Sequence, residues 1–396
     1  MLNPHRPGDA GLRHPQLNCV FLGLSITSTW GNGHATTYRG LLKELSRRGH
    51  KITFLERDVP WYASNREFDT LPYCSVALYE SFDELADRYA KLIETADVVV
   101  VGSYVPEGIV IGRWVTSIAK NVAAFYDIDT PVTLASLEAG KCEYLSWDLY
   151  PNYQLYLSFT GGPTLDFIQR KLGSPCARPL YCSVDPSLYY PEHAPARWDI
   201  AYLGTYAPDR QPAVEDLLLR VARESPTKRF AVAGPLYPQG IDWPANVERI
   251  EHIPAAEHRR FYNSQIFTLN LTRHDMVRAG YSPSVRLFEA AACGVPIITD
   301  RWPGLETFFT PYSEILPVRT WAEVSSYLQL ESERRYQVGT KARRRTLRFH
   351  TAAVRAQEFE GHVVASLERV SQSKKRSKTA LRQSPAAAAL VTEPRA

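Results

Sequence analysis

Residues 282–300, SPSVRLFEAAACGVPIITD, place an arginine and a glutamate on a predicted helix that precedes a buried strand. Ser282 is predicted to cap the helix, and Pro283 suits its first turn, because a missing N–H costs nothing there. Arg286 and Glu289 are three residues apart and therefore share a face. A helix N-terminus beside an arginine favours a diphosphate, and the carboxylate further along suits the paired hydroxyls of a ribose. The motif therefore predicts a nucleoside-diphosphate ligand.

Further candidates for binding the phosphates lie in two loops that each follow a predicted strand. Gly204 and Thr205 end one strand, and Arg210 follows in the same loop. Arg273 stands at the equivalent place after another strand. Loop N–H groups and guanidinium groups both bind phosphate, and parallel sheets bind ligands beyond the carboxyl ends of their strands. The alternative interpretation is that both arginines are ordinary surface residues.

A candidate general base lies in the amino-terminal half. His34 ends the sequence GNGH in the loop after the first predicted strand. An imidazole titrates near neutral pH, so it can take a proton from a hydroxyl group. Asp127 and Asp129 form a D-x-D that could contact the acceptor or orient His34. A metal role for this pair and a structural turn before Pro131 are the alternatives.

The glycines around His34 allow a second interpretation. Gly31 and Gly33 could open a dinucleotide-binding loop, with Glu56 at the end of the next strand as the acid that binds a ribose. Thr36 stands where the third glycine of G-x-G-x-x-G belongs, so the motif is incomplete. We expect these glycines to let the backbone approach a sugar instead. The candidate residues of the acceptor-side loops are Gly31, Asn32, Gly33, Gly161 and Gly162.

The composition is that of a globular protein with an ample core, because 44% of the 396 residues are hydrophobic and 22% are charged. The net charge of +4 gives no reason to expect a nucleic-acid partner. The first residues lack the apolar core of a secretory signal, and no apolar run is long enough to span a membrane. Six scattered cysteines favour reduced thiols, so we expect a cytoplasmic protein. Weak contact with an anionic membrane surface is a further possibility for the basic residues Lys341, Arg343, Arg344, Arg345, Arg348, Lys374, Lys375, Arg376 and Lys378.

Two runs of alternating strands and helices predict an α/β protein with two doubly wound, Rossmann-like parallel-sheet domains that face each other across a cleft. A proline-rich stretch separates the two runs. The predicted divisions are a disordered start at 1–17, an acceptor domain at 18–175, a linker at 176–198, a nucleotide-sugar domain at 199–345, a helix crossing back at 346–370 and a disordered tail at 371–396.

Three segments together resemble the GT-B glycosyltransferases, and within them the CgeB-like (spore-maturation) group with a carboxyl-terminal domain like that of group 1 glycosyl transferases. They are residues 23–58 around GNGH, CSVDPSLYYP at 182–191, and the motif at 282–300. The resemblance implies that the second domain holds a sugar nucleotide and the first holds the acceptor. It makes Glu289 the ribose-binding acid, His34 the base, and the surroundings of His252 a nucleobase contact. Tyr281 departs from the pattern, because the wider retaining family has a glutamate there.

The sequence therefore predicts a glycosyltransferase that moves a sugar from a nucleotide-diphosphate sugar to an unidentified hydroxyl acceptor. No metal and no cofactor is expected, since arginines and a helix N-terminus would stabilise the leaving diphosphate. The alternatives are an NAD- or FAD-dependent oxidoreductase and a GT-B module that binds a nucleotide sugar or glycan without catalysis. The catalytic candidates are His34, Asp127 and Asp129, and the donor-binding candidates are Gly204, Thr205, Arg210, His252, Arg273, Ser282, Ser284, Arg286 and Glu289.

Overall fold

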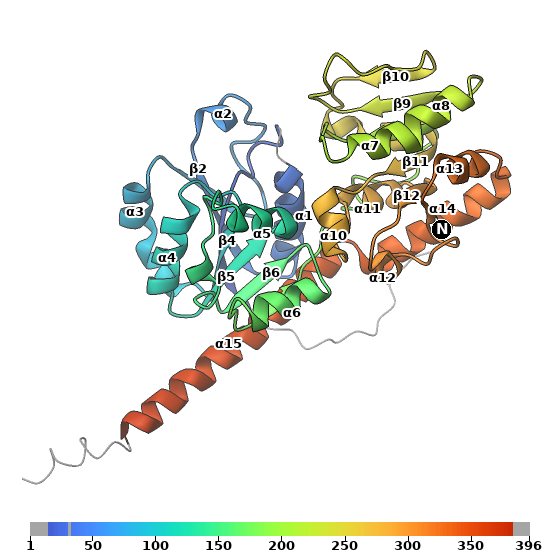
Figure 1. The fold of residues 1–396 in the computed structure, drawn as a ribbon. Coiled ribbons are helices and arrows are strands. Elements are labelled where there is room, and N and C mark those ends of the chain that lie inside the picture. Colours follow the sequence, from blue (N-terminus) through green and yellow to red (C-terminus); the bar gives the residue numbers. More distant parts are fainter. Residues whose placement is uncertain (1–14, 31–32, 383–396) are drawn as a thin grey trace, which may run out of the picture.

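The computed structural model describes residues 15–30 and 33–382. The first domain is a seven-stranded parallel sheet in the order β3-β2-β1-β4-β5-β6-β7, with helices on both faces (Figure 1). Its strands are β1 (Asn18–Gly23), β2 (Lys51–Arg57), β3 (Ser75–Tyr79), β4 (Val98–Gly102), β5 (Val122–Asp127), β6 (Leu155–Ser158) and β7 (Ala177–Pro179). Its helices are α1 (Gly33–Arg47), α2 (Pro60–Ala63), α3 (Phe82–Thr95), α4 (Gly108–Ile118), α5 (Thr130–Glu138), the 3-10 turn η1 (Trp147–Leu149) and α6 (Pro163–Arg170).

The second domain is a six-stranded parallel sheet in the order β10-β9-β8-β11-β12-β13. Its strands are β8 (Trp198–Leu203), β9 (Phe230–Ala233), β10 (Val247–Ile250), β11 (Gln265–Asn270), β12 (Ile297–Asp300) and β13 (Leu316–Val318). Its helical segments are α7 (Gln211–Val214), η2 (Glu215–Leu219), α8 (Arg220–Glu224), η3 (Ala255–Glu257), α9 (His258–Asn263), α10 (His274–Ala279), α11 (Val285–Ala292), α12 (Leu305–Phe308) and α13 (Trp321–Tyr327).

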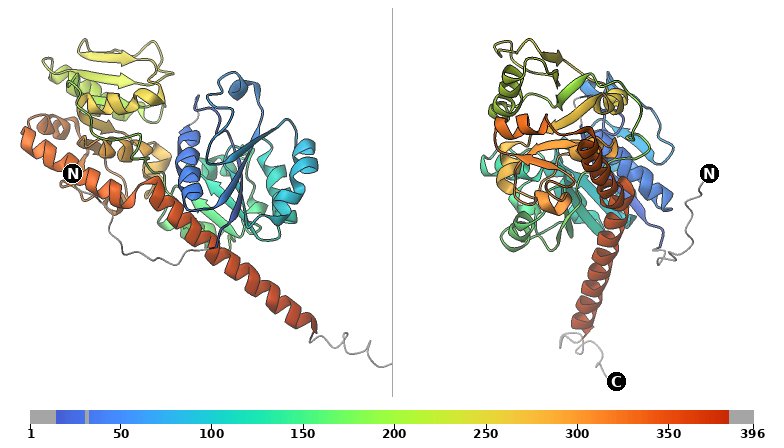
Figure 2. Two further views of the ribbon diagram at one scale, coloured as in Figure 1. Left: turned by 180° about the vertical axis from the view of Figure 1, so that it is seen from behind. Right: turned by 90° about the vertical axis from the view of Figure 1, so that its right-hand side faces the viewer.

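Two long helices follow the second sheet and join the two domains. Helix α14 (Ser332–Phe349) lies on the second domain, and α15 (Ala352–Arg382) crosses back to pack on α1 (Figure 2). An ion pair between Arg48 and Glu360 holds α15 against the end of α1, and Lys43 of α1 pairs with Asp185 of the segment between β7 and β8 at 2.8 Å. The end of α15 projects beyond the first domain (Figure 1).

The predicted fold class is confirmed, because both domains are parallel sheets covered by helices. The structure corrects two predicted boundaries. Strand β7 lies within the predicted linker and completes the first sheet, while α15 continues to Arg382, through the first part of the predicted disordered tail. The predicted disorder at 1–14 and 383–396 lies outside the described residues. All six cysteines are free thiols. Among the described helices, none combines the length and apolar character that crossing a membrane requires.

Candidate functional site

A cavity of about 550 Å³ opens between the two domains, at the carboxyl ends of both sheets. The first domain contributes the start of α1 and the loops after β4 and β5, and the second contributes the loops after β8 and β11 and the start of α11. We call this space the cleft cavity. Among the residues predicted from sequence, it brings together Gly33, His34, Asp129, Thr205, Arg210, Arg273 and Ser284.

His34 and Asp129 form a pair on the wall given by the first domain. His34 lies in the first turn of α1, and its Nε2 is 3.6 Å from Oδ2 of Asp129, which lies just before α5. Burial alone would raise the pKa of the Asp129 carboxyl, but the interaction with His34 and the charge of Arg273 outweigh burial and lower it. The Asp129 carboxylate is therefore kept in its charged form beside the imidazole of His34.

Tyr104 completes this pair, and the sequence analysis missed it. Its hydroxyl donates to Oδ2 of Asp129 at 3.3 Å, and its ring lies 5.3 Å from the ring of His34. It follows β4, a strand whose residues are all buried, and its φ of 64° is rare for a residue with a side chain. A tyrosine two residues after such a strand is the signal that could have identified it, since strand ends line the sites of parallel sheets.

Asp127 does not face the cleft cavity, contrary to the prediction. It is fully buried, with Oδ1 accepting from Thr133 at 2.8 Å and from the Asp129 N–H at 3.1 Å, and Oδ2 accepting from Tyr156 at 2.5 Å. Burial raises its pKa to about 6. Asp127 therefore shapes the turn that presents Asp129. The D-x-D does not converge on one point, and the described residues contain no group of three or more metal-ligating side chains.

Glu56 is also turned inward, which removes the basis of the dinucleotide interpretation. Its carboxylate is fully buried and accepts from the hydroxyls of Ser25 and Thr27, each at 2.7 Å. It also accepts from the N–H groups of Ile26 at 2.7 Å and Thr27 at 3.1 Å. An acid held by four hydrogen bonds to the loop after β1 shapes that loop and does not face a ribose. Gly31 and Asn32 lie outside the described residues.

Three arginines of the second domain, Arg210, Arg273 and Arg286, lie close together, and the first two line the cleft cavity. Arg210 donates to the Thr205 carbonyl at 2.5 Å, and its pKa is lowered by burial and by the charges of Arg286 and Arg273. Arg286 donates to Asn270 at 3.0 Å. The Nε of each of the three arginines is buried and has no hydrogen-bond partner among the described residues. A cluster of guanidinium groups of this kind favours an anionic ligand.

Gly204 is required where it stands. A Cβ at this position would lie 2.5 Å from Oη of Tyr202 and 3.0 Å from Nη2 of Arg286. Tyr202 in turn supports Arg286, whose guanidinium lies 5.0 Å from the centre of the tyrosine ring. Gly204 and Arg286 do not line the cleft cavity themselves, but they support the loop of Thr205 and Arg210 that does.

The motif at 282–300 folds differently from the prediction at its start. Helix α11 begins at Val285, its cap position is Ser284, and no side chain caps it. Ser282 is buried and its hydroxyl is 2.9 Å from that of Thr160 in the first domain. Glu289 is only 6% exposed, does not line the cleft cavity, and accepts from the Tyr262 hydroxyl at 2.9 Å. The ribose-binding role of Glu289 stays a prediction.

The remaining candidates join the domains. The Gly161 N–H donates to the carbonyl of Tyr281 at 2.9 Å, and Cβ atoms at Gly162 or Gly304 would overlap the tyrosine ring. Gly161 and Gly162 are therefore placed against Tyr281 and not in the cleft cavity. His252 is exposed and its ring lies 5.5 Å from that of Trp30, across the domain boundary.

Several solved structures share the two-domain architecture of this chain. Sucrose-phosphate synthase from Thermosynechococcus elongatus is 14% identical, with a TM-score of 0.62, and the match covers 89% of this chain and 99% of that one. Anabaena HepE in complex with UDP and glucose is 10% identical, with a TM-score of 0.64 and coverage of 88% and 100%. The chain has the GT-B fold. An alpha-glucosyltransferase in complex with UDP-glucose and DNA shares this GT-B fold at 12% identity, with a TM-score of 0.64 and coverage of 88% and 100%.

The sequence comparisons concern the second domain of this GT-B protein. Residues 210–361, less than half of the chain, match a family described as glycosyl transferase-like. No curated protein matches the chain. The family match and the GT-B fold together support a glycosyltransferase. Assignment to the CgeB-like group stays a prediction.

Proposed function

We propose that this protein transfers a sugar from a nucleoside-diphosphate sugar to a hydroxyl acceptor, with His34 as the general base. One observation carries the proposal: a single cavity is lined by the His34–Asp129 pair from one domain and by Arg210 and Arg273 from the other. A base and an anion site on opposite walls are what a displacement at a sugar carbon requires. The base takes the proton of the attacking hydroxyl, and the anion site receives the leaving diphosphate.

In the proposed reaction the acceptor oxygen attacks the anomeric carbon of the donor while His34 removes the hydroxyl proton. The bond between the anomeric carbon and the diphosphate oxygen breaks, and the electron pair leaves with the diphosphate. Asp129 stabilises the imidazolium that forms, and Tyr104 holds the Asp129 carboxylate through its hydroxyl. A single displacement of this kind inverts the configuration at the anomeric carbon.

In this proposal, arginine side chains of the protein stabilise the negative charge of the leaving diphosphate. Arg210 and Arg273 line the cavity. The buried Nε–H of Arg210 has no hydrogen-bond partner among the described residues, and the Nε–H of Arg273 forms no hydrogen bond there but lies 3.8 Å from Oδ2 of Asp209. Both guanidinium groups can therefore donate to phosphate oxygens. Such charge-assisted hydrogen bonds replace the electrostatic work of a divalent ion, so we propose a metal-independent transfer. UDP-sugars are the first donors to test, because two of the similar structures were solved with UDP or UDP-glucose.

A panel of nucleotides and nucleotide sugars in a thermal-shift assay tests donor binding, since a ligand that binds the folded state raises the melting temperature. Donors that bind are then incubated with the protein, and release of the nucleoside diphosphate is measured. His34→Ala should abolish release and leave nucleotide binding intact. His193→Ala, at an exposed histidine outside the cleft cavity, should keep both. Full turnover by His34→Ala would exclude His34 as the base.

The non-catalytic alternative predicts a different result from the same assays. A GT-B module that only binds would show a thermal shift with a nucleotide sugar and no release of the diphosphate, with or without added hydroxyl compounds. The oxidoreductase alternative loses its support in the structure, because Glu56 is enclosed by the chain's own loop.

A further inference from the structure

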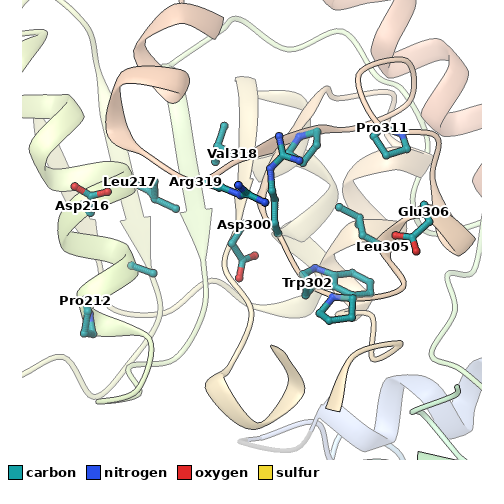
Figure 3. A pocket seen from close by; sticks show the side chains of 14 residues that line it. Pro212, Asp216, Leu217, Asp300, Trp302, Leu305, Glu306, Pro311, Val318 and Arg319 are labelled. Carbon is teal, nitrogen blue, oxygen red and sulfur yellow. The ribbon is translucent and has the colours of Figure 1, made fainter. Parts of the chain in front are cut away.

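The second domain holds another cavity, of about 760 Å³, that shares no lining residue with the cleft cavity. It lies at the carboxyl ends of β12 and β13, between α7 with η2 on one side and the loop leading into α12 on the other (Figure 3). We call it the β12–β13 cavity. Its volume is within the range of sites for small molecules, roughly 300–1,000 Å³.

Prolines fix much of the wall of this cavity. Pro212, Pro303, Pro311 and Pro317 line it from four different segments. The proline ring fixes φ, so these segments have little backbone freedom to lose when a ligand binds. The β12–β13 cavity is therefore formed before any ligand arrives.

The charged side chains of the cavity leave an excess of positive charge. Asp216 pairs with Arg220 at 3.4 Å, and burial raises the pKa of Asp300, which disfavours its charged form. Within residues 15–30 and 33–376, Arg301 and Arg319 form no ion pair, which leaves the exposed Glu306 as the one opposing carboxylate of the lining. Two cations against one such carboxylate favour an anionic ligand.

Two hydrogen-bond donors of the wall are buried without partners. Trp302 lines the cavity beside Asp300, and its side chain is 5% exposed (Figure 3). Its Nε1–H and the Nε–H of Arg301 find no acceptor among the described residues. A buried donor without an acceptor costs free energy, which a ligand rich in acceptor oxygens would recover. A phosphate group supplies both these acceptors and the negative charge.

The β12–β13 cavity is connected to the cleft cavity through Asp300 and Thr272. Asp300 lines the former, and its carboxylate accepts from the Thr272 N–H at 3.1 Å and from the Thr272 hydroxyl at 2.9 Å. Thr272 directly precedes Arg273, which lines the cleft cavity and whose charge acts on Asp129. A ligand that moves Asp300 therefore moves the loop that carries Arg273.

We propose that the β12–β13 cavity is a second binding site, for a small phosphate ester, and that its occupancy is transmitted to the cleft through Asp300 and Thr272. The existence of the site does not depend on the proposed function, whereas its effect on donor binding does.

Calorimetric titration with glucose 6-phosphate, with and without saturating UDP, tests the site. Each charge-assisted contact that is removed should weaken binding by about tenfold, so the double variant Arg301→Ala/Arg319→Ala should bind far less tightly. Arg197→Ala is the matched control, because this arginine is exposed, pairs with Glu248 at 3.1 Å and lies outside both cavities. Absence of saturable binding, or binding that the double variant retains, overturns the proposal. Binding that UDP abolishes would assign the phosphate to the cleft and also overturn it.

The connection is tested by measuring UDP affinity with and without glucose 6-phosphate. The wild-type affinity should change, and Thr272→Val, which lacks the hydroxyl that Asp300 accepts from, should bind the phosphate ester with a smaller change in UDP affinity. A wild-type affinity that does not respond refutes the connection. If no nucleotide or nucleotide sugar of the panel binds, the proposed function fails while the titration with glucose 6-phosphate still reports on the site. Recovery of unchanged glucose 6-phosphate after incubation with UDP-glucose is expected of a ligand of the second site, whereas its glycosylation would place it in the cleft as an acceptor and overturn the proposal.

Discussion

Asp127→Asn should change how the stability of the protein depends on pH, in a direction fixed by the burial of this carboxyl. Asp127 has no exposed surface, and burial raises its pKa from 3.8 to about 6. Asparagine has the same shape, and its carbonyl oxygen can accept the hydrogen bonds from Thr133 and the Asp129 N–H. Its amide nitrogen would face the Tyr156 hydroxyl, whose donated hydrogen bond is lost at every pH.

The size of the effect follows from the shift. About two pKa units correspond to about 3 kcal/mol of unfolding free energy at roughly 1.4 kcal/mol per unit. Because the folded-state pKa lies above the unfolded value, the folded protein holds the proton more tightly. This stabilising contribution is complete below about pH 4 and is lost as the pH rises through about 6. Asparagine cannot ionise, so the variant does not lose unfolding free energy at this position as the pH rises.

Urea unfolding of both proteins across about pH 4 to 8 measures the difference. The stability of Asp127→Asn relative to wild type should rise by about 3 kcal/mol between the two ends of this range, whatever constant cost the lost Tyr156 bond adds. Taking the difference in unfolding free energy between the two proteins cancels the contributions of the other titrating groups, which both proteins share. A difference between the two proteins that stays constant with pH would refute the assignment of Asp127 as a buried acid with a raised pKa.

Three further predictions concern other parts of the fold. Hydrogen bonds from Arg113 lower the pKa of Asp148 to about 2. The stability that the Asp148 carboxylate contributes is therefore present above about pH 4 and is lost as the pH falls through 2. Asp148→Asn should lack this acid-dependent loss, which urea midpoints at low pH measure. Gly162→Ala should cost about 1–3 kcal/mol, because φ is 58° and the new methyl overlaps the Tyr281 ring, and a normal urea midpoint would contradict this packing. Arg210→Ala should weaken UDP binding by about 10- to 100-fold in calorimetry without lowering the melting temperature, and unchanged affinity would remove Arg210 from the phosphate site.

The strands of the two sheets could be predicted wherever their residues are buried on both faces. Val98–Gly102 is an example, since its run of valines reads as a strand without further context. Strand β3 cannot be predicted in this way, because it lies at the edge of the sheet and its residues are mostly half-buried, which leaves no continuous apolar run. Strand β7 was missed for a similar reason, because a strand of three residues ending at Pro179 resembles a linker.

The loops of the site could be predicted because of their place at strand ends. His34, Arg210 and Arg273 each follow a strand that the sequence identifies, and parallel sheets gather such positions on one edge. Their meeting across two domains could not be predicted, because it depends on how the sheets face each other. Tyr281 shows the limit: its contacts with Gly162 and Gly304 join segments that are far apart in the chain.

The acids of this protein show why residue type and spacing do not identify a ligand contact. Glu56 and Glu289 were both candidates for a ribose, and each is buried with its carboxylate accepting hydrogen bonds from the chain itself. Asp129 is partly exposed and lines the cleft cavity, although its neighbour Asp127, two residues earlier, is enclosed. A carboxylate is available to a ligand only when the fold leaves one side of it open, and long-range packing decides which side that is. The carboxylate that the fold leaves open beside the base is Asp129, so the chemistry of the cleft depends on the pair that it forms with His34.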